Sequence, residues 1–244
     1  MSTPLRIAMW SGPRSLSTAL MRSFGNRADT FVTDEPLYAH YLKVTKLAHP
    51  GADEVIATQE NDWRRALAWL TGPVPEGKAI WYQKHMTHHL LPQIERDWLA
   101  DLTHAFLLRD PLDVLPSLDA KFAQPNLADT GMAQQLEIFE FVRQRTGRVP
   151  VVIDTADLLH DPEGTLRALC AALGIEFDAQ MLQWPAGRRS TDGVWAKHWY
   201  HNVEKSTGFA SERTRHTELN SQLAALYQEC LPYYEALHAQ RLRA

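Results

Sequence analysis

The sequence predicts an α/β protein in which helices cover both faces of a parallel sheet, giving three layers. Two observations lead to this fold class: short apolar runs alternate with longer segments of helical periodicity, and several apolar runs end in polar or charged residues. At 244 residues, of which 45% are hydrophobic, the chain is long enough to form one sizeable core. We therefore expect a single domain over residues 1–244.

Strands are expected where short apolar runs are bounded by turn-forming residues. The segment Thr71-Gly72-Pro73-Val74-Pro75, for example, separates a helical pattern from the apolar run that follows it. The expected strands cover residues 5–10, 30–34, 78–83, 103–108 and 150–154. In a sheet of this kind ligands bind at the carboxyl ends of the strands, so those ends hold the candidate site.

Helical patterns occupy much of the chain between these strands. One of them begins after Asp161-Pro162, a favourable helix start, and stops at Gly174. We expect helices at residues 15–26, 36–47, 61–70, 87–99, 111–122, 131–146, 162–173 and 211–241, and a loop at residues 52–59. Residues 184–209 are irregular, aromatic and basic, and we expect them to form a lid or substrate-binding segment.

The bulk properties restrict the partners and the compartment. The formal charge of −4 argues against a surface that coats nucleic acid, and no apolar run reaches the roughly 20 residues that cross a membrane. The first residues lack the layout of a secretion signal. The only cysteines, Cys170 and Cys230, form neither a disulfide framework nor a zinc site. We expect a cytoplasmic protein that binds small molecules, not nucleic acid or a membrane.

The most informative segment joins the first expected strand to the first expected helix. It combines a cation and several hydroxyls with a helix N-terminus, whose N–H groups and dipole favour an anion. Its residues, which we predict to bind phosphate, are Gly12, Pro13, Arg14, Ser15, Leu16, Ser17 and Thr18. The alternative is an ordinary strand-to-helix turn with a serine cap. The loop is not a Walker sequence, because Leu16-Ser17 stand where that motif has Gly-Lys.

A second candidate group follows the expected strand at residues 103–108. Arg109 leaves the end of this strand, and Ser117 lies eight residues later on the next helix. An arginine at a buried strand end is costly to leave unpaired, so we expect Arg109 to contact a phosphate or a carboxylate. The carboxylate alternative is an ion pair with Asp113.

The third group, Lys84 and His85, follows the expected strand at residues 78–83. A lysine and a histidine in this place can supply a charge clamp and a general base. His85 and His89 also have the spacing of a metal pair, but the Glu of H-E-x-x-H is missing and no third ligand is evident. We therefore expect no metal.

In this order and spacing, the three groups resemble the sulfotransferases that use 3′-phosphoadenosine-5′-phosphosulfate as the sulfuryl donor. The resemblance implies a P-loop-type sheet, a first loop that holds the 5′-phosphosulfate, and a 3′-phosphate held by Arg109 and Ser117. It also implies that His85 is the general base for the acceptor. Arg14 and Lys84 would stabilise the charge on the leaving 5′-phosphate.

The chain departs from that family at several positions. Leu16 stands where Gly is usual, Arg14 where Lys is frequent, and Ala19 where cytosolic members have a Trp that stacks on adenine. The late Arg-Lys-Gly phosphate clamp is absent. The candidate replacements, with solvated loop charges as the alternative, are Arg188, Arg189 or Lys205 with Ser206 and Thr207.

Glu35 is a second candidate for the base. The run Thr33-Asp34-Glu35-Pro36 resembles the Glu-Pro pair that supplies the base in some bacterial sulfotransferases, but Asp34 and Glu35 can equally cap the next helix. We favour His85, because an imidazole with an ordinary pKa of about 6.5 suits proton transfer at neutral pH.

The expected function is transfer of a sulfuryl group to a hydroxyl or amine of a small acceptor, by an in-line displacement that does not require Mg²⁺. Two alternatives remain. An ATP-dependent small-molecule kinase would use Asp154, at the end of the strand at residues 150–154, as a metal ligand. A non-catalytic module would bind a nucleotide without turnover.

Overall fold

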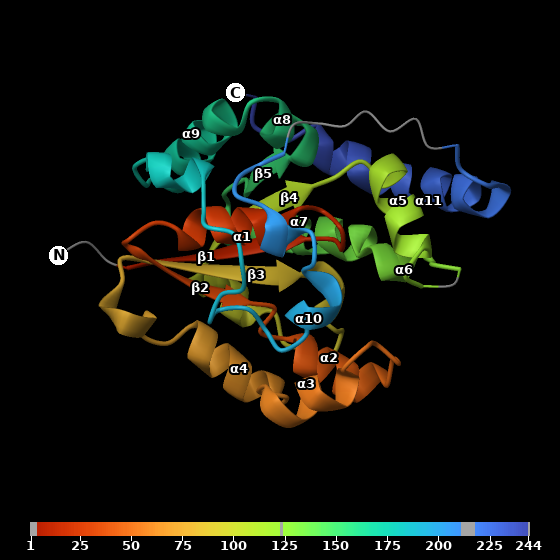
Figure 1. The fold of residues 1–244 in the computed structure, drawn as a ribbon, viewed down its shortest axis with the longest axis horizontal. Coiled ribbons are helices and arrows are strands. Elements are labelled where there is room, and N and C mark those ends of the chain that lie inside the picture. Colours follow the sequence, from red (N-terminus) through yellow and green to blue (C-terminus); the bar gives the residue numbers. More distant parts are fainter. Residues whose placement is uncertain (1–3, 123, 211–217, 244) are drawn as a thin grey trace.

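The computed structural model describes residues 4–122, 124–210 and 218–243. Its centre is a five-stranded parallel sheet with the strand order β2-β3-β1-β4-β5 (Figure 1). The strands are β1 (Leu5–Ser11), β2 (Thr30–Asp34), β3 (Ile80–Met86), β4 (Thr103–Leu108) and β5 (Val151–Asp154). All five overlap the predicted strands, and the α/β fold class is confirmed.

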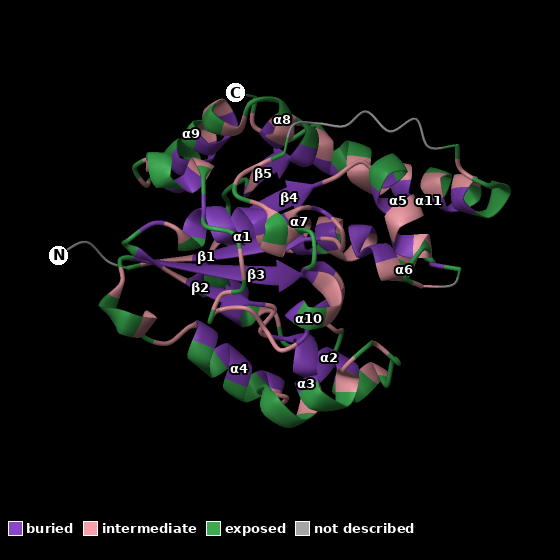
Figure 2. Ribbon diagram, viewed as in Figure 1, coloured by how far each residue is buried: buried purple, intermediate pink, exposed green. Residues whose placement is uncertain are grey.

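Strand β1 lies in the middle of the sheet, between β3 and β4. Trp10 of β1 pairs with His85 on one side and with Phe106 on the other. The residues of β1 from Ile7 onward are buried, as is all of β3 (Figure 2). Buried parallel strands have continuous apolar sequences because both of their faces are covered. Because β1, β3 and β4 run parallel, their carboxyl ends lie at one edge of the sheet.

Helices cover the sheet on both faces and extend past its edges. Figure 1 shows α8 and α9 beside β5, and α2, α3 and α4 grouped beyond β2. The α-helices of the described ranges are α1 (Ser17–Gly25), α2 (Tyr38–Thr45), α3 (Ala52–Thr58), α4 (Trp63–Leu70), α5 (Pro111–Asp119), α6 (Leu127–Thr130), α7 (Met132–Thr146), α8 (Thr155–His160), α9 (Pro162–Leu173), α10 (Ala196–Trp199) and α11 (Ser221–His238).

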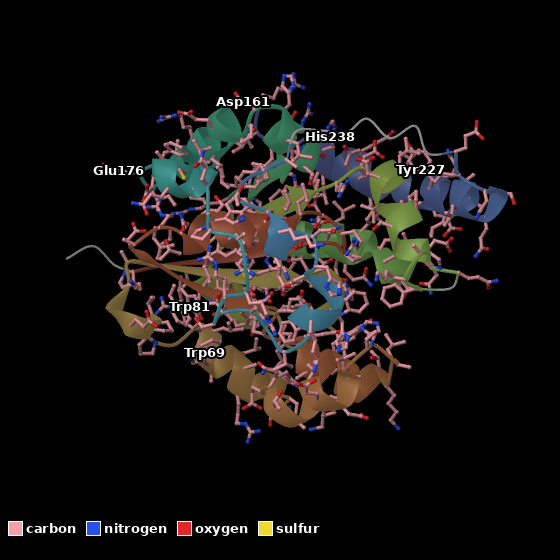
Figure 3. The ribbon with its side chains drawn as sticks, in the orientation of Figure 1. Trp69, Trp81, Asp161, Glu176, Tyr227 and His238 are labelled. Carbon is pink, nitrogen blue, oxygen red and sulfur yellow. The ribbon has the colours of Figure 1, made fainter. Side chains whose placement is uncertain are left out.

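Each face of the sheet has its own core, because successive side chains of a strand point in opposite directions. Tyr82 of β3 stacks on Phe24 of α1, with ring centroids 4.4 Å apart. Its neighbour Trp81 enters the other core, where Trp69 of α4 meets it edge-on at 4.8 Å (Figure 3). The side chains of adjacent residues in β3 therefore pack into different cores, on opposite faces of the sheet.

Two of the element predictions are wrong. Residues 52–59, expected to be a loop, contain α3, which buries Val55 and has Asp53 and Glu54 in its first turn, where the helix dipole favours acidic residues. Residues 87–99 are all described and form no α-helix; they contain 3₁₀ turns at Thr87–His89 and Asp97–Asp101 with an irregular stretch between. Pro92 lacks the N–H group that a continuous helix needs at this position.

The last helix is shorter than expected. It begins at Ser221, where the side chain of Asn220 accepts a hydrogen bond from the Leu223 N–H group and caps the N-terminus. Residues 211–217 of the predicted helix lie outside the described residues. Over the ranges that the structure does describe, no helix is both long and apolar enough to cross a bilayer.

Two histidines lie in the core that contains Trp10. Trp10 Nε1 donates to His104 Nδ1 at 2.9 Å, and His104 Nε2 donates to the Leu99 carbonyl at 2.7 Å, so His104 is a neutral imidazole. Burial lowers the pKa of His104 to about 4, and burial together with His104 lowers the pKa of His85 to about 3.

These histidines predict acid sensitivity. The unfolded chain binds a proton at each of them below about pH 6.5, whereas the folded chain does not until about pH 3 to 4. The free energy of unfolding should therefore decrease as the pH falls from 6.5, by up to about 1.4 kcal/mol per pH unit for each histidine. In His85→Phe the free energy of unfolding should decrease less over this range, because the contribution of one histidine is removed. Urea unfolding between pH 6.5 and 4.5 measures the difference. The exposed His201→Gln is the control, and an unchanged slope in His85→Phe would contradict this account.

Candidate active site

The loop after β1 presents an uncapped helix N-terminus at the carboxyl end of the sheet. Helix α1 begins at Ser17, and no side chain caps it. Arg14 and Leu16 have φ angles of 60° and 61°, a left-handed conformation that is costly for residues with side chains. An uncapped N-terminus leaves N–H groups available to an anion.

Neighbouring elements hold this loop in place. A Cβ atom at Gly12 would lie 2.6 Å from the Thr130 carbonyl oxygen, so only glycine fits there without a shift. Thr155, the first residue of α8, donates its hydroxyl to the Leu108 carbonyl at 2.6 Å, and the same oxygen lies 3.2 Å from the Ser15 carbonyl oxygen. The loop is therefore fixed by backbone contacts that do not occupy its N–H groups.

Two guanidinium groups meet beside the loop. Arg109, which follows β4, donates from Nη1 to the carbonyl oxygen of Arg14 at 2.8 Å, and Arg14 donates from Nε to Ser117 Oγ of α5 at 2.8 Å. Burial and the charge of Arg109 lower the pKa of Arg14, which means that this pair of cations is favoured by a bound anion. The structure thus brings Arg14, Arg109 and Ser117 together.

The ion pair foreseen as the alternative for Arg109 is also present. Its Nε lies 3.7 Å from Asp113 Oδ2, and the Asp113 side chain is 43% exposed. Exposed ion pairs of this kind contribute little. In the described part of the chain no carboxylate lies within ion-pair distance of Arg14, so this group of residues keeps a positive charge.

A second charged cluster lies at the ends of β2 and β3. Lys84 Nζ donates to Asp34 Oδ1 at 2.8 Å, to Glu35 Oε1 at 2.5 Å and to Tyr200 Oη at 2.9 Å. Burial opposes the charged form, but Asp34 and Glu35 raise the pKa of Lys84 well above its ordinary value. These contacts use all three donors of the ammonium group. In this arrangement Lys84 has no donor left for a leaving phosphate, which differs from the role predicted for it.

Among the residues that the structure describes, none donates a hydrogen bond to the second oxygen of Glu35, Oε2. Its Oε2 lies 4.0 Å from His89 Nδ1, beyond hydrogen-bond distance, and its side chain is 12% exposed, against 2% for Lys84. Burial and the neighbouring Asp34 raise the pKa of Glu35 despite the opposing effect of Lys84. A carboxylate with a raised pKa is better matched to proton transfer near neutral pH.

The structure does not bring His85 to the loop. Its side chain is 1% exposed and stacks on Trp10, with ring centroids 4.5 Å apart. His85 and Lys84 are adjacent in β3 and so point into different layers, and the lowered pKa of His85, about 3, makes it a weak base. The placement of His85 argues against its predicted role as the general base.

Neutral rings surround the free side of Glu35. His89 stacks on Tyr38 with centroids 4.8 Å apart and lies 4.6 Å from the ring of Tyr41. Burial, together with the neighbouring His88, lowers the pKa of His89 well below its ordinary value. The Nδ1 atoms of His88 and His89 have no hydrogen-bond partner among the described residues. Polar atoms without partners at a ring-lined position are available to a ligand.

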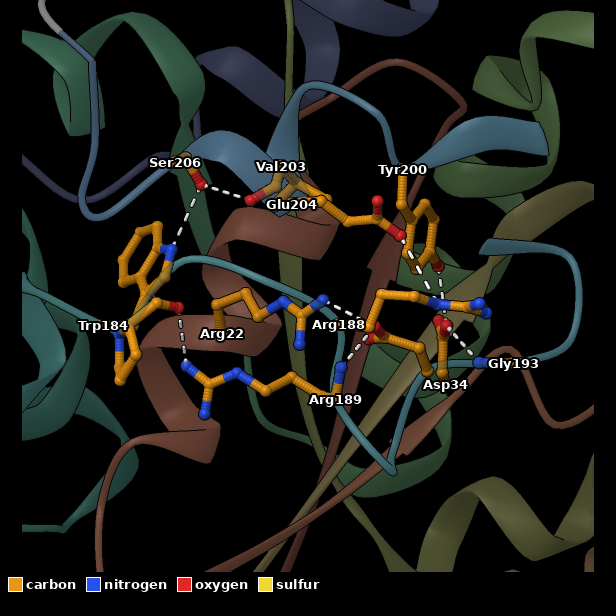
Figure 4. A network of polar contacts seen from close by, with 12 residues as sticks. Arg22, Asp34, Trp184, Arg188, Arg189, Gly193, Tyr200, Val203, Glu204 and Ser206 are labelled. Carbon is orange, nitrogen blue, oxygen red and sulfur yellow. Dashed lines mark hydrogen bonds and ion pairs between the residues drawn. The ribbon is translucent and has the colours of Figure 1, made fainter. Parts of the chain in front are cut away.

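Residues 184–209, here called the strap, run beside α1 and across the ends of β2 and β3 (Figure 4). Arg22 of α1 forms a buried ion pair with Asp192 of the strap at 2.6 Å. The Gly193 N–H group donates to Asp34 Oδ2 at 3.4 Å. The predicted lid segment is therefore a fixed part of the second charged cluster in this structure.

The predicted phosphate clamp at the end of the strap contacts the strap itself. Ser206 Oγ donates to the Val203 carbonyl at 2.7 Å and accepts from Trp184 Nε1 at 3.1 Å, while Lys205 is exposed. Arg188 pairs with Glu204 at 3.6 Å, also within the strap. A cavity of about 720 Å³ is lined by Thr207 and by Asp161, Pro162, Glu163, Leu182, Gln183, Trp184, Pro185, Gly208 and Phe209. No residue of the loop after β1 lines it, and a role for Lys205, Ser206 and Thr207 toward phosphate stays a prediction.

Asp154, the metal ligand of the kinase alternative, is used structurally. One oxygen accepts from the Ala156 N–H group at 2.7 Å and caps α8, and the other accepts from Tyr234 Oη at 3.0 Å. Within the described ranges, no three His, Cys, Asp or Glu side chains are grouped to hold a metal ion.

The fold and these two clusters define an α/β protein in which an uncapped helix N-terminus with two arginines and a buried group of carboxylates and lysine lie at the carboxyl ends of the strands. The chain belongs to the sulfotransferase domain family, which it matches over residues 5–241. The resemblance inferred from the three sequence groups is thereby confirmed at the level of the family.

Two curated relatives come from Arabidopsis thaliana. Branched-chain-amino-acid aminotransferase-like protein 1 is 38% identical over 242 residues, which is 98% of this chain and 42% of the relative. Branched-chain-amino-acid aminotransferase-like protein 2 is 38% identical over 231 residues, covering 95% of this chain and 41% of the relative. The chain thus spans about two fifths of the length of these relatives.

Solved structures share the fold at low sequence identity. A sulfotransferase from Alicyclobacillus acidocaldarius superposes with a TM-score of 0.55 and 13% identity, covering 99% of this chain and 98% of that one. The sulfotransferase domain from the curacin biosynthetic pathway gives 0.52 and 16%, covering 94% and 98%. At this identity the comparison shows the fold alone.

The sequence patterns do not predict the contacts of Asp34 and Tyr200 with Lys84. Asp34 is a candidate helix cap by sequence, and the only signal for its contact is that Asp34 and Lys84 each lie at the end of an expected strand. Tyr200 is 116 residues from Lys84 in the chain, and no local pattern reveals that its hydroxyl contacts the lysine.

The loop geometry predicts that Gly12→Ala is destabilising. Its Cβ atom would contact the Thr130 carbonyl oxygen, and strain of this kind costs about 1–3 kcal/mol. Gly25→Ala, whose Cβ would meet only the Val32 methyl groups at 3.4 Å, is the matched control. Urea unfolding of both variants tests this, and equal stability of Gly12→Ala and the wild type would contradict the close approach.

Proposed function

We propose that this protein transfers a sulfuryl group from 3′-phosphoadenosine-5′-phosphosulfate to a hydroxyl or amine of a small acceptor. The meeting of Arg14, Arg109 and Ser117 at an uncapped helix N-terminus is the observation that supports this donor most strongly. Two cations and a hydroxyl suit a ligand with separate phosphate groups. The free N–H groups of the loop suit the 5′-phosphosulfate, and Arg109 with Ser117 suits the 3′-phosphate.

Glu35 is the general base in this proposal, in place of His85. It takes the proton of the acceptor as the acceptor oxygen or nitrogen bonds to sulfur and the bond from sulfur to the 5′-phosphate oxygen breaks. Arg14 and the N–H groups of the loop stabilise the charge left on that phosphate. The bound donor supplies the activated sulfuryl group, and the protein supplies position, charge and a proton acceptor.

We further propose that the protein works in a reducing compartment such as the cytoplasm. Cys170 and Cys230 are both free and buried thiols, and such thiols persist where disulfides are rare.

The cofactor assignment predicts a preference for a 3′-phosphorylated nucleotide. Without metal, isothermal titration calorimetry should show tighter binding of 3′-phosphoadenosine 5′-phosphate than of ADP or ATP. In Arg109→Ala the affinity for the 3′-phosphorylated nucleotide should fall by about 10- to 100-fold, the value of a hydrogen bond to a charged group, while that for ADP changes little.

Arg143→Ala is the matched control, because Arg143 is an exposed arginine of α7 that pairs with Glu140. Equal losses of affinity for both nucleotides in Arg109→Ala would contradict the proposal that Arg109 binds the 3′-phosphate. Binding of ATP that appears only with Mg²⁺ would instead support the kinase alternative.

The base assignment predicts opposite effects for the two candidate residues. Glu35→Gln should lower the rate of sulfuryl transfer by about 10²- to 10⁴-fold, because the amide keeps the shape but not the basicity of the carboxylate. His85→Phe, which preserves a ring against Trp10, should keep most of the activity. The assay follows transfer from radiolabelled donor to a panel of alcohols, phenols and amines. The reverse pattern would return the base to His85.

A further inference from the structure

We propose that Tyr200 of the strap is a positioning residue that orients the base, by holding Lys84 and Asp34 in the arrangement that fixes the Glu35 carboxylate. The inference rests on the proposed function, in which Glu35 is the base. The strap would then help to position the reacting groups through Tyr200.

The hydroxyl group of Tyr200 is the junction of this network. It accepts hydrogen bonds from Lys84 Nζ at 2.9 Å and from Trp195 Nε1 at 3.2 Å, and it donates to Asp34 Oδ2 at 2.6 Å. One donor and two acceptor positions are all that a hydroxyl has. The hydroxyl therefore has a defined orientation, and Figure 4 shows it directed at Asp34.

Removing this hydroxyl would leave two charged groups under-satisfied. Lys84 would have two partners for three donors, and Asp34 Oδ2 would keep only the 3.4 Å contact from the Gly193 N–H group. Both side chains are 2% exposed, so water does not readily replace the lost contact. Glu35 accepts one of the three Lys84 hydrogen bonds. The orientation of the Glu35 carboxylate therefore depends on the position of the Lys84 ammonium group.

The strap is held so that Tyr200 reaches this position. Trp195 packs edge-on against Tyr38 of α2, with centroids 5.2 Å apart, and the Asp192–Arg22 ion pair fixes the preceding turn to α1. The Tyr200 ring also lies 5.3 Å from Lys84 Nζ, as a cation–π contact. The strap thus contributes a ring and a hydroxyl to a lysine from another part of the chain.

Five ionisable groups face Glu35 from the elements packed around it. They are Asp34 of β2, Lys84 of β3, His89 of the turn after β3, Tyr38 of α2 and Tyr200 of the strap. Burial and Asp34 raise the pKa of Glu35, whereas Lys84, which donates to Glu35 Oε1 and is itself held by the Tyr200 hydroxyl, lowers it. Without the Tyr200 hydroxyl, Lys84 loses one of its three partners and is held less firmly against Glu35. The weaker contact with the ammonium group should therefore raise the pKa of Glu35.

The test is a pH titration of the Glu35 carboxyl carbon by NMR, in protein with ¹³C-labelled glutamate and with the signal assigned by its absence in Glu35→Gln. In Tyr200→Phe the pKa of Glu35 should rise by about one unit, equivalent to a tenfold higher proton affinity. Tyr233→Phe is the matched control and should leave the titration unchanged, because the half-buried Tyr233 of α11 packs against a different hydrophobic cluster. An unchanged pKa in Tyr200→Phe overturns the proposal, whether or not the protein transfers sulfuryl groups.

Two further measurements separate this inference from the proposed function. Affinity for 3′-phosphoadenosine 5′-phosphate should stay within about twofold of wild type in Tyr200→Phe, because the donor-binding residues are distinct from Tyr200. The pH at which sulfuryl transfer reaches half its maximum should move up together with the pKa. A large loss of nucleotide affinity would show a general structural role and overturn the proposal. A shifted pKa in a protein that binds no such nucleotide would instead contradict the proposed function alone.

Discussion

The ammonium group of Lys84 imposes the central constraint on this structure. A cation at 1% residue exposure is tolerable only if every donor is matched, and Asp34, Glu35 and Tyr200 provide the three acceptors. The parallel pairing of β2 with β3 places Asp34 opposite Lys84, and the strap brings the tyrosine. The hydrogen bonds of Lys84 therefore depend both on the pairing of β2 with β3 and on the path of the strap.

Two clusters of opposite character lie at the same edge of the sheet. Arg14 and Arg109 follow the ends of β1 and β4, and their charges favour an anion. The ends of β2 and β3 carry two carboxylates and one ammonium, which leaves a net negative charge suited to taking a proton. In the proposed in-line transfer, charge grows on the leaving group beside the first cluster while the acceptor gives its proton to the second. The two clusters lie at the same edge because parallel strands end together.

Much of the fold follows from local sequence, and less of the site does. The five strands are mostly apolar runs. Arg14 and Arg109 follow strand ends and Ser117 lies about two helix turns into α5, so their meeting was predictable. The sequence places His85 beside Lys84, whereas alternation along β3 sends its side chain into the core against Trp10, and sequence adjacency does not show this difference. Tyr200 depends on tertiary packing alone. The wrong element predictions also depend on single residues. Residues 52–58 form a helix that buries Val55, and Pro92 lies in the stretch at residues 87–99 that forms no α-helix.

A crystal structure of the protein with 3′-phosphoadenosine 5′-phosphate tests the central claim most directly. The account predicts the 3′-phosphate between Arg109 and Ser117, the 5′-phosphate on the N–H groups at the start of α1, and Glu35 Oε2 facing the 5′-phosphate. A nucleotide bound instead in the cavity lined by Trp184 and Phe209, with the loop after β1 making no contact to phosphate, would contradict it.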